Sequence, residues 1–76
     1  MKTVKVSIDS IEKVKEFVTI VNEYPYDFDL VTGRYVINAK SIMGIFSLYL
    51  SKPIELHAHT DNAKEFLNAI DKFIVK

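Results

Sequence analysis

Hydrophobic and polar residues alternate with a period of two in four stretches of the chain. In TVKVSI, for example, the valines and the isoleucine share one face and the polar residues share the other. This period predicts β-strands with one buried and one solvated face. Gly33 lies in the short connection between the second and third stretches, so these two are expected to form an antiparallel hairpin. The four stretches are residues 3–8 (TVKVSI), 27–31 (DFDLV), 35–39 (YVINA) and 53–59 (PIELHAH).

Two other stretches carry apolar residues every three or four positions, which predicts amphipathic helices. One covers residues 11–23, with Asp9 or Ser10 as its N-cap. The other is at the C-terminus, where Thr60 or Asp61 is expected to be the cap. The predicted core positions are Ile11, Val14, Phe17, Val18 and Val21 in the first helix and Ala63, Phe66, Leu67, Ile70, Phe73 and Ile74 in the last.

The stretch SIMGIFSLYL, residues 41–50, is too continuously apolar for a half-buried strand. We expect a helix of about two to three turns, with Ser41 as its N-cap. The predicted order is strand, helix, strand, strand, helix, strand, helix. Three helices would then cover the apolar face of one four-stranded antiparallel sheet, which is an α+β fold in a single domain over residues 1–76.

Composition narrows the classes of function. The chain is 49% hydrophobic and 26% charged, as expected of a folded domain. Ten Lys and Arg residues balance ten Asp and Glu residues, so the basic excess typical of nucleic-acid binding is missing. The lack of cysteine excludes disulfides, thiolate zinc sites and thiol redox chemistry. No stretch reads as a signal peptide or a membrane span, so we expect a cytoplasmic protein without nucleic-acid or membrane partners.

The chain shows no pattern of catalytic or cofactor-binding residues. Gly33 and Gly44 are its only glycines, so a glycine-rich phosphate loop is absent. None of the serines after the first strand has a histidine close to it in sequence that would activate it as a nucleophile. We therefore expect no enzyme activity and no cofactor.

Two histidines form the one pattern that suggests a metal site. His57 and His59 lie two residues apart on a predicted strand and share a face with Glu55. Such a pair binds a metal when a third ligand converges on it, and Asp27 or Asp29 is a candidate for that ligand. The simpler interpretation is that the pair belongs to the solvated side of a sheet.

The segment KSIMGIFSL, residues 40–48, resembles the regulatory serine region of HPr, the phosphocarrier of the bacterial sugar phosphotransferase system. The N-terminal KTVKVSIDS, residues 2–10, is similar to the first strand of that family and the loop after it. The resemblance implies the HPr fold, an open-faced β-sandwich. It also implies that Ser41 is a target of HPr kinase/phosphorylase and that the helix after it presents an apolar docking surface. The candidate partner-binding residues are Lys40, Ile42, Met43, Ile45 and Phe46.

The passage that corresponds to the active site of the family departs from the family pattern. HPr proteins carry their phosphoryl group on a histidine that opens the first helix and is followed by alanine, arginine and proline. Here the passage is DSIEKVKEF, residues 9–17, which is shorter and has no histidine, arginine or proline. Asp9 and Glu12 would repel a phosphoryl group at this helix start. Tyr49 is a second departure, because the family usually has glycine there.

These features predict an HPr-like protein without phosphohistidine carrier activity, similar in this respect to the Crh proteins. It would be a regulatory or protein-binding module, controlled by phosphorylation of Ser41, with HPr kinase/phosphorylase or a transcriptional regulator as partner. Two simpler interpretations stay open: Ser41 is only an N-cap, and Ile42 and Phe46 only pack on the sheet, whereas Met43 is expected at the surface. An alternative is a ferredoxin-like small-molecule-binding domain of the ACT kind, which has the same order of strands and helices up to the fourth strand.

Overall fold

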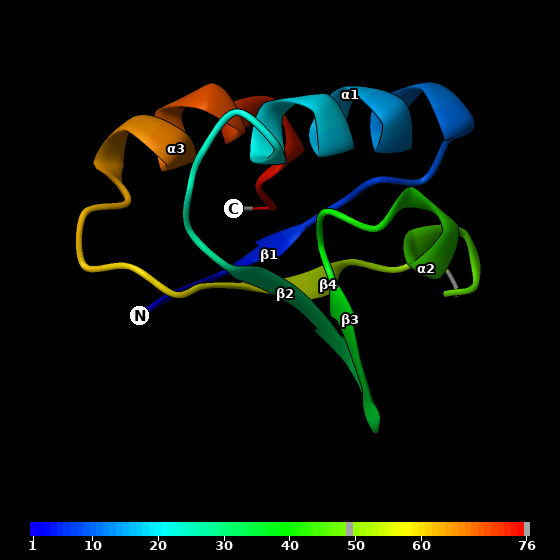
Figure 1. The fold of residues 1–76 in the computed structure, drawn as a ribbon. Coiled ribbons are helices and arrows are strands. Elements are labelled where there is room, and N and C mark those ends of the chain that lie inside the picture. Colours follow the sequence, from blue (N-terminus) through cyan, green and yellow to red (C-terminus); the bar gives the residue numbers. More distant parts are fainter. Residues whose placement is uncertain (49, 76) are drawn as a thin grey trace.

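A computed structural model describes residues 1–48 and 50–75, and Figure 1 shows its fold. Its strands are β1 (Lys2–Val6), β2 (Phe28–Thr32), β3 (Tyr35–Asn38) and β4 (Ile54–Ala58). Its helices are α1 (Ile11–Val21), α2 (Ile42–Phe46) and α3 (Lys64–Ala69), followed by a short 3-10 helix, η1 (Asp71–Phe73). The order of elements confirms the order that the sequence pattern predicts.

The four strands form a single antiparallel sheet in the order β1-β4-β2-β3. Leu30 of β2 lies opposite Leu56 of β4, so that both side chains enter the core from the same face. The predicted hairpin joins β2 to β3 through a two-residue turn, in which Gly33 has a φ of 56°. A positive φ at the first central position is typical of a type II′ turn, which glycine adopts without strain.

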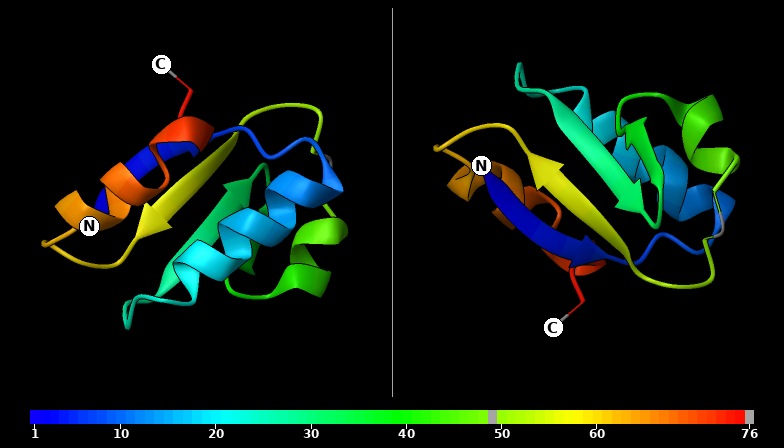
Figure 2. Two further views of the ribbon diagram at one scale, coloured as in Figure 1. Left: turned by 90° about the horizontal axis from the view of Figure 1, so that it is seen from above. Right: turned by 90° about the horizontal axis from the view of Figure 1, so that it is seen from below.

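All three helices lie on the same side of the sheet (Figures 1 and 2). α3 lies over the β1 side of the sheet, α1 lies over the β2 side, and α2 lies beside β3 at the edge. Between helices and sheet, Phe28 packs against Phe66 and Phe17 meets Phe73 edge-on, with ring centroids 4.3 and 5.7 Å apart. The opposite face of the sheet is open, which confirms the predicted α+β open-faced sandwich.

The C-terminal segment covers part of the outer edge of β1. The backbone N–H of Ser7 donates to the carbonyl of Phe73, and the N–H of Val75 donates to the carbonyl of Lys5. Val6 and Ile74 form an antiparallel bridge between these two bonds. This pairing satisfies backbone groups that an edge strand would otherwise expose.

Several predicted boundaries are wrong, among them the end of α1, which is at Val21 rather than at residue 23. β1 ends at Val6 rather than at residue 8. α3 begins at Lys64 without a side-chain cap, because the Thr60 hydroxyl accepts from the N–H of Asn62 and the Asp61 carboxylate pairs with the N-terminal amine. The helix predicted over residues 41–50 ends at Phe46, where the N–H groups of the next two residues bond to carbonyls three positions back and close the last turn. Tyr49 lies outside the described residues.

The strand pairing also excludes the ferredoxin-like alternative. In the sheet of such a domain the first strand lies between two other strands. Here β1 lies at the edge of the sheet and pairs with β4 alone among the four strands. Among the described residues, no helix is long and apolar enough to cross a membrane.

Candidate functional site

The start of α1 is a capped turn with a local ion pair. Ser10 is the N-cap, and its hydroxyl accepts a hydrogen bond from the backbone N–H of Lys13 at 3.1 Å. Of the two caps predicted, Ser10 is therefore the correct one. The Asp9 carboxylate instead pairs with the Lys13 ammonium at 2.9 Å, and this hydrogen bond and positive charge hold the pKa of Asp9 below its ordinary value of 3.8.

This helix start presents negative charge. Asp9 is ionised at neutral pH, and Glu12 lies in the first turn of α1. A phosphoryl acceptor at a helix start needs the free N–H groups and positive dipole end of the helix. Here one of these N–H groups donates to the Ser10 hydroxyl, and the carboxylates of Asp9 and Glu12 lie at the same helix start. The turn is therefore poorly suited to bind a phosphoryl group.

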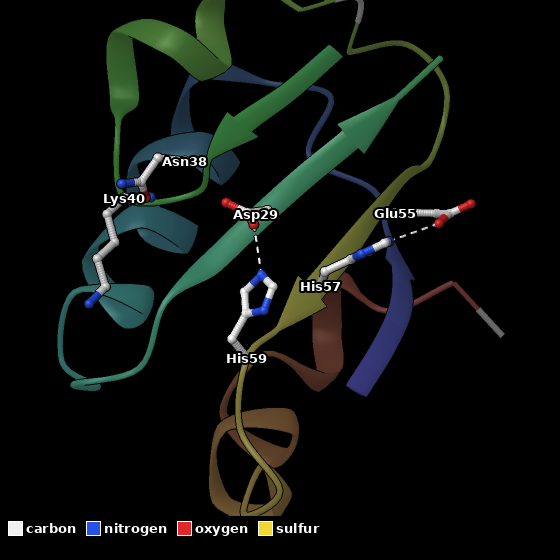
Figure 3. A network of polar contacts seen from close by, with 6 residues as sticks. All are labelled: Asp29, Asn38, Lys40, Glu55, His57 and His59. Atoms are coloured by element: carbon white, nitrogen blue, oxygen red, sulfur yellow. Dashed lines mark hydrogen bonds and ion pairs between the residues drawn. The ribbon is translucent and has the colours of Figure 1, made fainter. Parts of the chain in front are cut away.

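Both histidines of the chain lie on the open face of the sheet, on the side away from the helices (Figure 3). His57 Nε2 is 3.0 Å from Glu55 Oε1, and His59 Nε2 is 2.7 Å from Asp29 Oδ2. The prediction that Glu55 and the two histidines share one face of the strand is thus correct. Each imidazole has its own carboxylate partner, and the described residues contain no group of three metal-binding side chains.

The start of α2 has the same capping arrangement as α1. The hydroxyl of Ser41 accepts from the backbone N–H of Gly44 at 3.2 Å, which confirms Ser41 as the N-cap. Ser41 is exposed, and no acidic residue lies in the first turn of this helix. Its hydroxyl is therefore accessible from solvent and free of neighbouring negative charge within its own helix.

Gly44 sets how closely α2 approaches the sheet. A Cβ atom at this position would lie 2.7 Å from Cγ2 of Ile37 on β3 and 3.2 Å from the Ser41 hydroxyl oxygen. Real Cβ atoms essentially never lie within 3.0 Å of another heavy atom, as this one would from Ile37 Cγ2. Glycine is thus needed here for close packing rather than for an unusual backbone angle.

The helix α2 divides its apolar residues between the core and the surface. Met43 and Phe46 are 77% and 41% exposed, and Ile42 is half-buried against the core. The predicted surface position of Met43 is correct. Ile45 is completely buried, so its predicted role in partner binding is wrong, because the side chain faces the sheet between its exposed neighbours.

The ammonium of Lys40 contacts the loop after α1. Its ammonium donates to the carbonyl of Tyr24 at 2.9 Å and lies 5.7 Å from the centroid of the Phe28 ring. Its backbone N–H donates to the side chain of Asn38. These contacts tie the segment before α2 to the loop after α1, and the partner-binding role of Lys40 stays a prediction.

Sequence reasoning missed one exposed apolar residue near α2. Ile11 was expected in the core, because it continues the apolar spacing of α1, yet it is 63% exposed. It is the first residue of α1, and this end of the helix lies beside the C-terminal end of α2 (Figure 2). The apolar period shows which side of a helix is buried, but not how far the sheet extends beneath its first turn.

The open-faced sandwich, with a serine-capped short helix at its edge, defines a recognised class of protein. A family model described as the PTS HPr component phosphorylation site matches residues 12–76. The chain therefore belongs to the HPr family, whose members are phosphocarriers rather than enzymes. The match begins inside α1, after the position at which the helix opens.

Two solved structures are similar to the chain over nearly its whole length. HPr-C-His from Thermoanaerobacter tengcongensis is 28% identical with a TM-score of 0.79, and the alignment covers 95% of this chain and 89% of that one. The phosphocarrier protein HPr from Bacillus anthracis is 29% identical with a TM-score of 0.76, covering 97% and 94%. No curated protein sequence matches the chain.

Proposed function

We propose that this protein is a cytoplasmic binding module of the HPr family that carries no phosphohistidine. It acts by docking a protein partner on the α2 surface, which we define as Ile42, Met43 and Phe46. Phosphorylation of Ser41, next to this surface, controls the docking. Candidate partners are an HPr kinase/phosphorylase and a transcriptional regulator.

The main support for the proposal is the set of residues at the start of α1. A phosphocarrier needs a nucleophilic imidazole at this position, and the residues present are Asp9, Ser10 and Ile11. The Asp9–Lys13 ion pair and the Ser10 cap use the groups that would otherwise bind a phosphoryl group. The two histidines lie elsewhere, on the open face of the sheet, and each is paired with a carboxylate.

Exposed apolar side chains support the docking role. A methionine that is 77% exposed is a flexible, polarisable contact, and such residues are frequent on surfaces that bind proteins. Phe46 adds an aromatic side chain of the kind that dominates interface energetics. Ile11 lies at the neighbouring end of α1 and extends the exposed apolar area.

Partner binding tests the α2 surface. The ¹⁵N-labelled protein is titrated with an HPr kinase/phosphorylase, and the amide signals of Met43 and Phe46 are expected to shift or broaden first. Phe46→Ala should weaken binding about tenfold or more, as expected of a buried aromatic contact. Val36→Ala is the control, because Val36 is 63% exposed, against 41% for Phe46, but lies on the open face. Equal losses in both variants would contradict the proposal.

Kinase treatment tests Ser41. Incubation with HPr kinase and ATP should add a single phosphoryl group, located by peptide mass spectrometry. Ser41→Ala should abolish it, whereas Ser47→Ala should not, although Ser47 is also exposed and lies at the other end of α2. If phosphorylation persisted in Ser41→Ala, Ser41 would not be the phosphorylated residue, and the proposed regulation of docking by Ser41 would be excluded.

A further inference from the structure

A half-open pocket of about 720 Å³ lies between the β2–β3 turn and the end of α2. Thr32, Gly33, Arg34 and Tyr35 form the side contributed by the turn, and Ser47 and Leu48 form the side that follows α2. The volume is within the range of pockets that hold small organic ligands. The pocket is separate from the α1 start and from the histidines.

The described lining residues combine apolar surface with one positive charge. Ile37, Leu48 and the ring of Tyr35 make most of the lining apolar. Arg34 is the only charged residue among the described residues that line the pocket. Its guanidinium makes no ion pair or hydrogen bond within the described part of the chain, so its five N–H donors are available to a ligand.

We propose that this pocket binds a small monoanion with an apolar body, such as an aromatic or aliphatic carboxylate. The planar guanidinium of Arg34 binds a carboxylate through two parallel hydrogen bonds. The apolar body then lies against Ile37 and Leu48 and loses its contact with water. Inorganic phosphate fits less well, because it has no apolar body to lie against the mostly apolar lining.

The pocket is next to α2 but does not depend on the docking role proposed for that helix. Ser47 is the C-cap of α2 and also lines the pocket. Met43 and Phe46 are not among the pocket residues. Ligand binding and partner binding can therefore be measured on different signals, and either can fail alone.

An NMR titration tests the proposal with a matched pair of probes. The ¹⁵N-labelled protein is titrated with 4-phenylbutyrate and, separately, with 4-phenylbutyramide, which has the same shape but no charge. For a ligand of about twelve heavy atoms we expect a Kd in the millimolar range. The carboxylate should shift the amides of Gly33, Ser47 and Leu48 to saturation, and the amide analogue should bind about tenfold more weakly.

Substitutions assign the effect to Arg34. Arg34→Met keeps the length of the side chain and should reduce carboxylate affinity about tenfold, to the level of the uncharged probe. Lys15→Met is the control, because it removes an exposed positive charge from α1 instead. Both variants should keep the wild-type spectrum elsewhere, because both side chains are exposed. Equal affinity for the two probes, no effect of Arg34→Met, or shifts confined to Met43 and Phe46 would overturn the proposal.

Discussion

The starts of α1 and α2 use the same capping device but offer different chemistry. Ser10 and Ser41 each accept a hydrogen bond from the backbone N–H three residues later, at 3.1 and 3.2 Å. At α1 the cap is flanked by Asp9 and Glu12. At α2 the first turn has no acidic residue, and exposed Met43 follows the cap.

This comparison shows that a shared backbone arrangement does not fix function. Both helix starts direct N–H groups and the positive end of the helix dipole toward solvent. Two carboxylates at α1 make that end unsuitable for phosphate, whereas α2 keeps an exposed hydroxyl beside apolar surface. The two helix starts therefore differ in the side chains around each cap, not in the cap itself.

Gly44→Ala should have the largest effect on stability. The added methyl group would lie 2.7 Å from Ile37 Cγ2 and must push α2 away from β3. Overpacking costs about 1–3 kcal/mol, and the higher helix propensity of alanine offsets up to about 1 kcal/mol of this. We expect a net loss of about 1–2 kcal/mol in the free energy of unfolding, measured by urea denaturation.

A double-mutant cycle sharpens this prediction. Ile37→Ala removes the side chain that the new methyl group meets. Gly44→Ala should therefore cost about 1 kcal/mol less in the Ile37→Ala background than in the wild type. Strictly additive losses would mean that α2 does not pack on β3 as the structure has it.

Removal of either serine cap should have a smaller, nearly equal effect. Ser10→Ala and Ser41→Ala each lose one capping hydrogen bond, worth about 1 kcal/mol. Aspartate is also a good N-cap, so Ser10→Asp and Ser41→Asp should retain most of the stability. Thermal unfolding checks all four variants. If Ser41→Ala did not change the stability, the two serine caps would not be equivalent.

The ion pair at α1 should have the smallest effect and depend on pH. The pKa of Asp9 is lowered in the folded state, so its contribution to stability is present above the unfolded value near 3.8 and is lost as the pH falls through the lowered folded pKa. Asp9→Asn should thus lower the melting temperature slightly at pH 7 and make no difference well below pH 3.8. The carboxyl titration of Asp9, followed by NMR, should move up toward 3.8 in Lys13→Gln.

Much of the fold could be predicted because its strands alternate regularly. The alternation around Leu30 and Leu56 predicts which side chains enter the core, and Gly33 predicts the hairpin turn. The start of α3 could not be predicted, because Thr60 and Asp61 are good caps by residue type but bond to other partners. The end of α2 depends on turn-closing bonds for which the apolar run gives no signal.

The candidate site could be predicted only in part. Residue type is enough to indicate a cap at Ser41 and a surface position for Met43. Side-chain direction decides the rest: Ile45 is buried one position from exposed Phe46, and the ammonium of Lys40 reaches a carbonyl sixteen residues earlier in the chain. The Arg34 pocket joins two segments that are distant in sequence, so a motif search does not find it.

Treatment with Enzyme I and phosphoenolpyruvate, followed by intact-mass spectrometry at neutral pH, tests directly whether the protein carries a phosphoryl group on histidine. An HPr phosphocarrier in the same reaction serves as the positive control and should gain one phosphoryl group. We expect no gain in mass for this protein, because the start of α1 has no imidazole to accept the group. A stoichiometric phosphoryl adduct that disappears in acid and maps to His57 or His59 would contradict it.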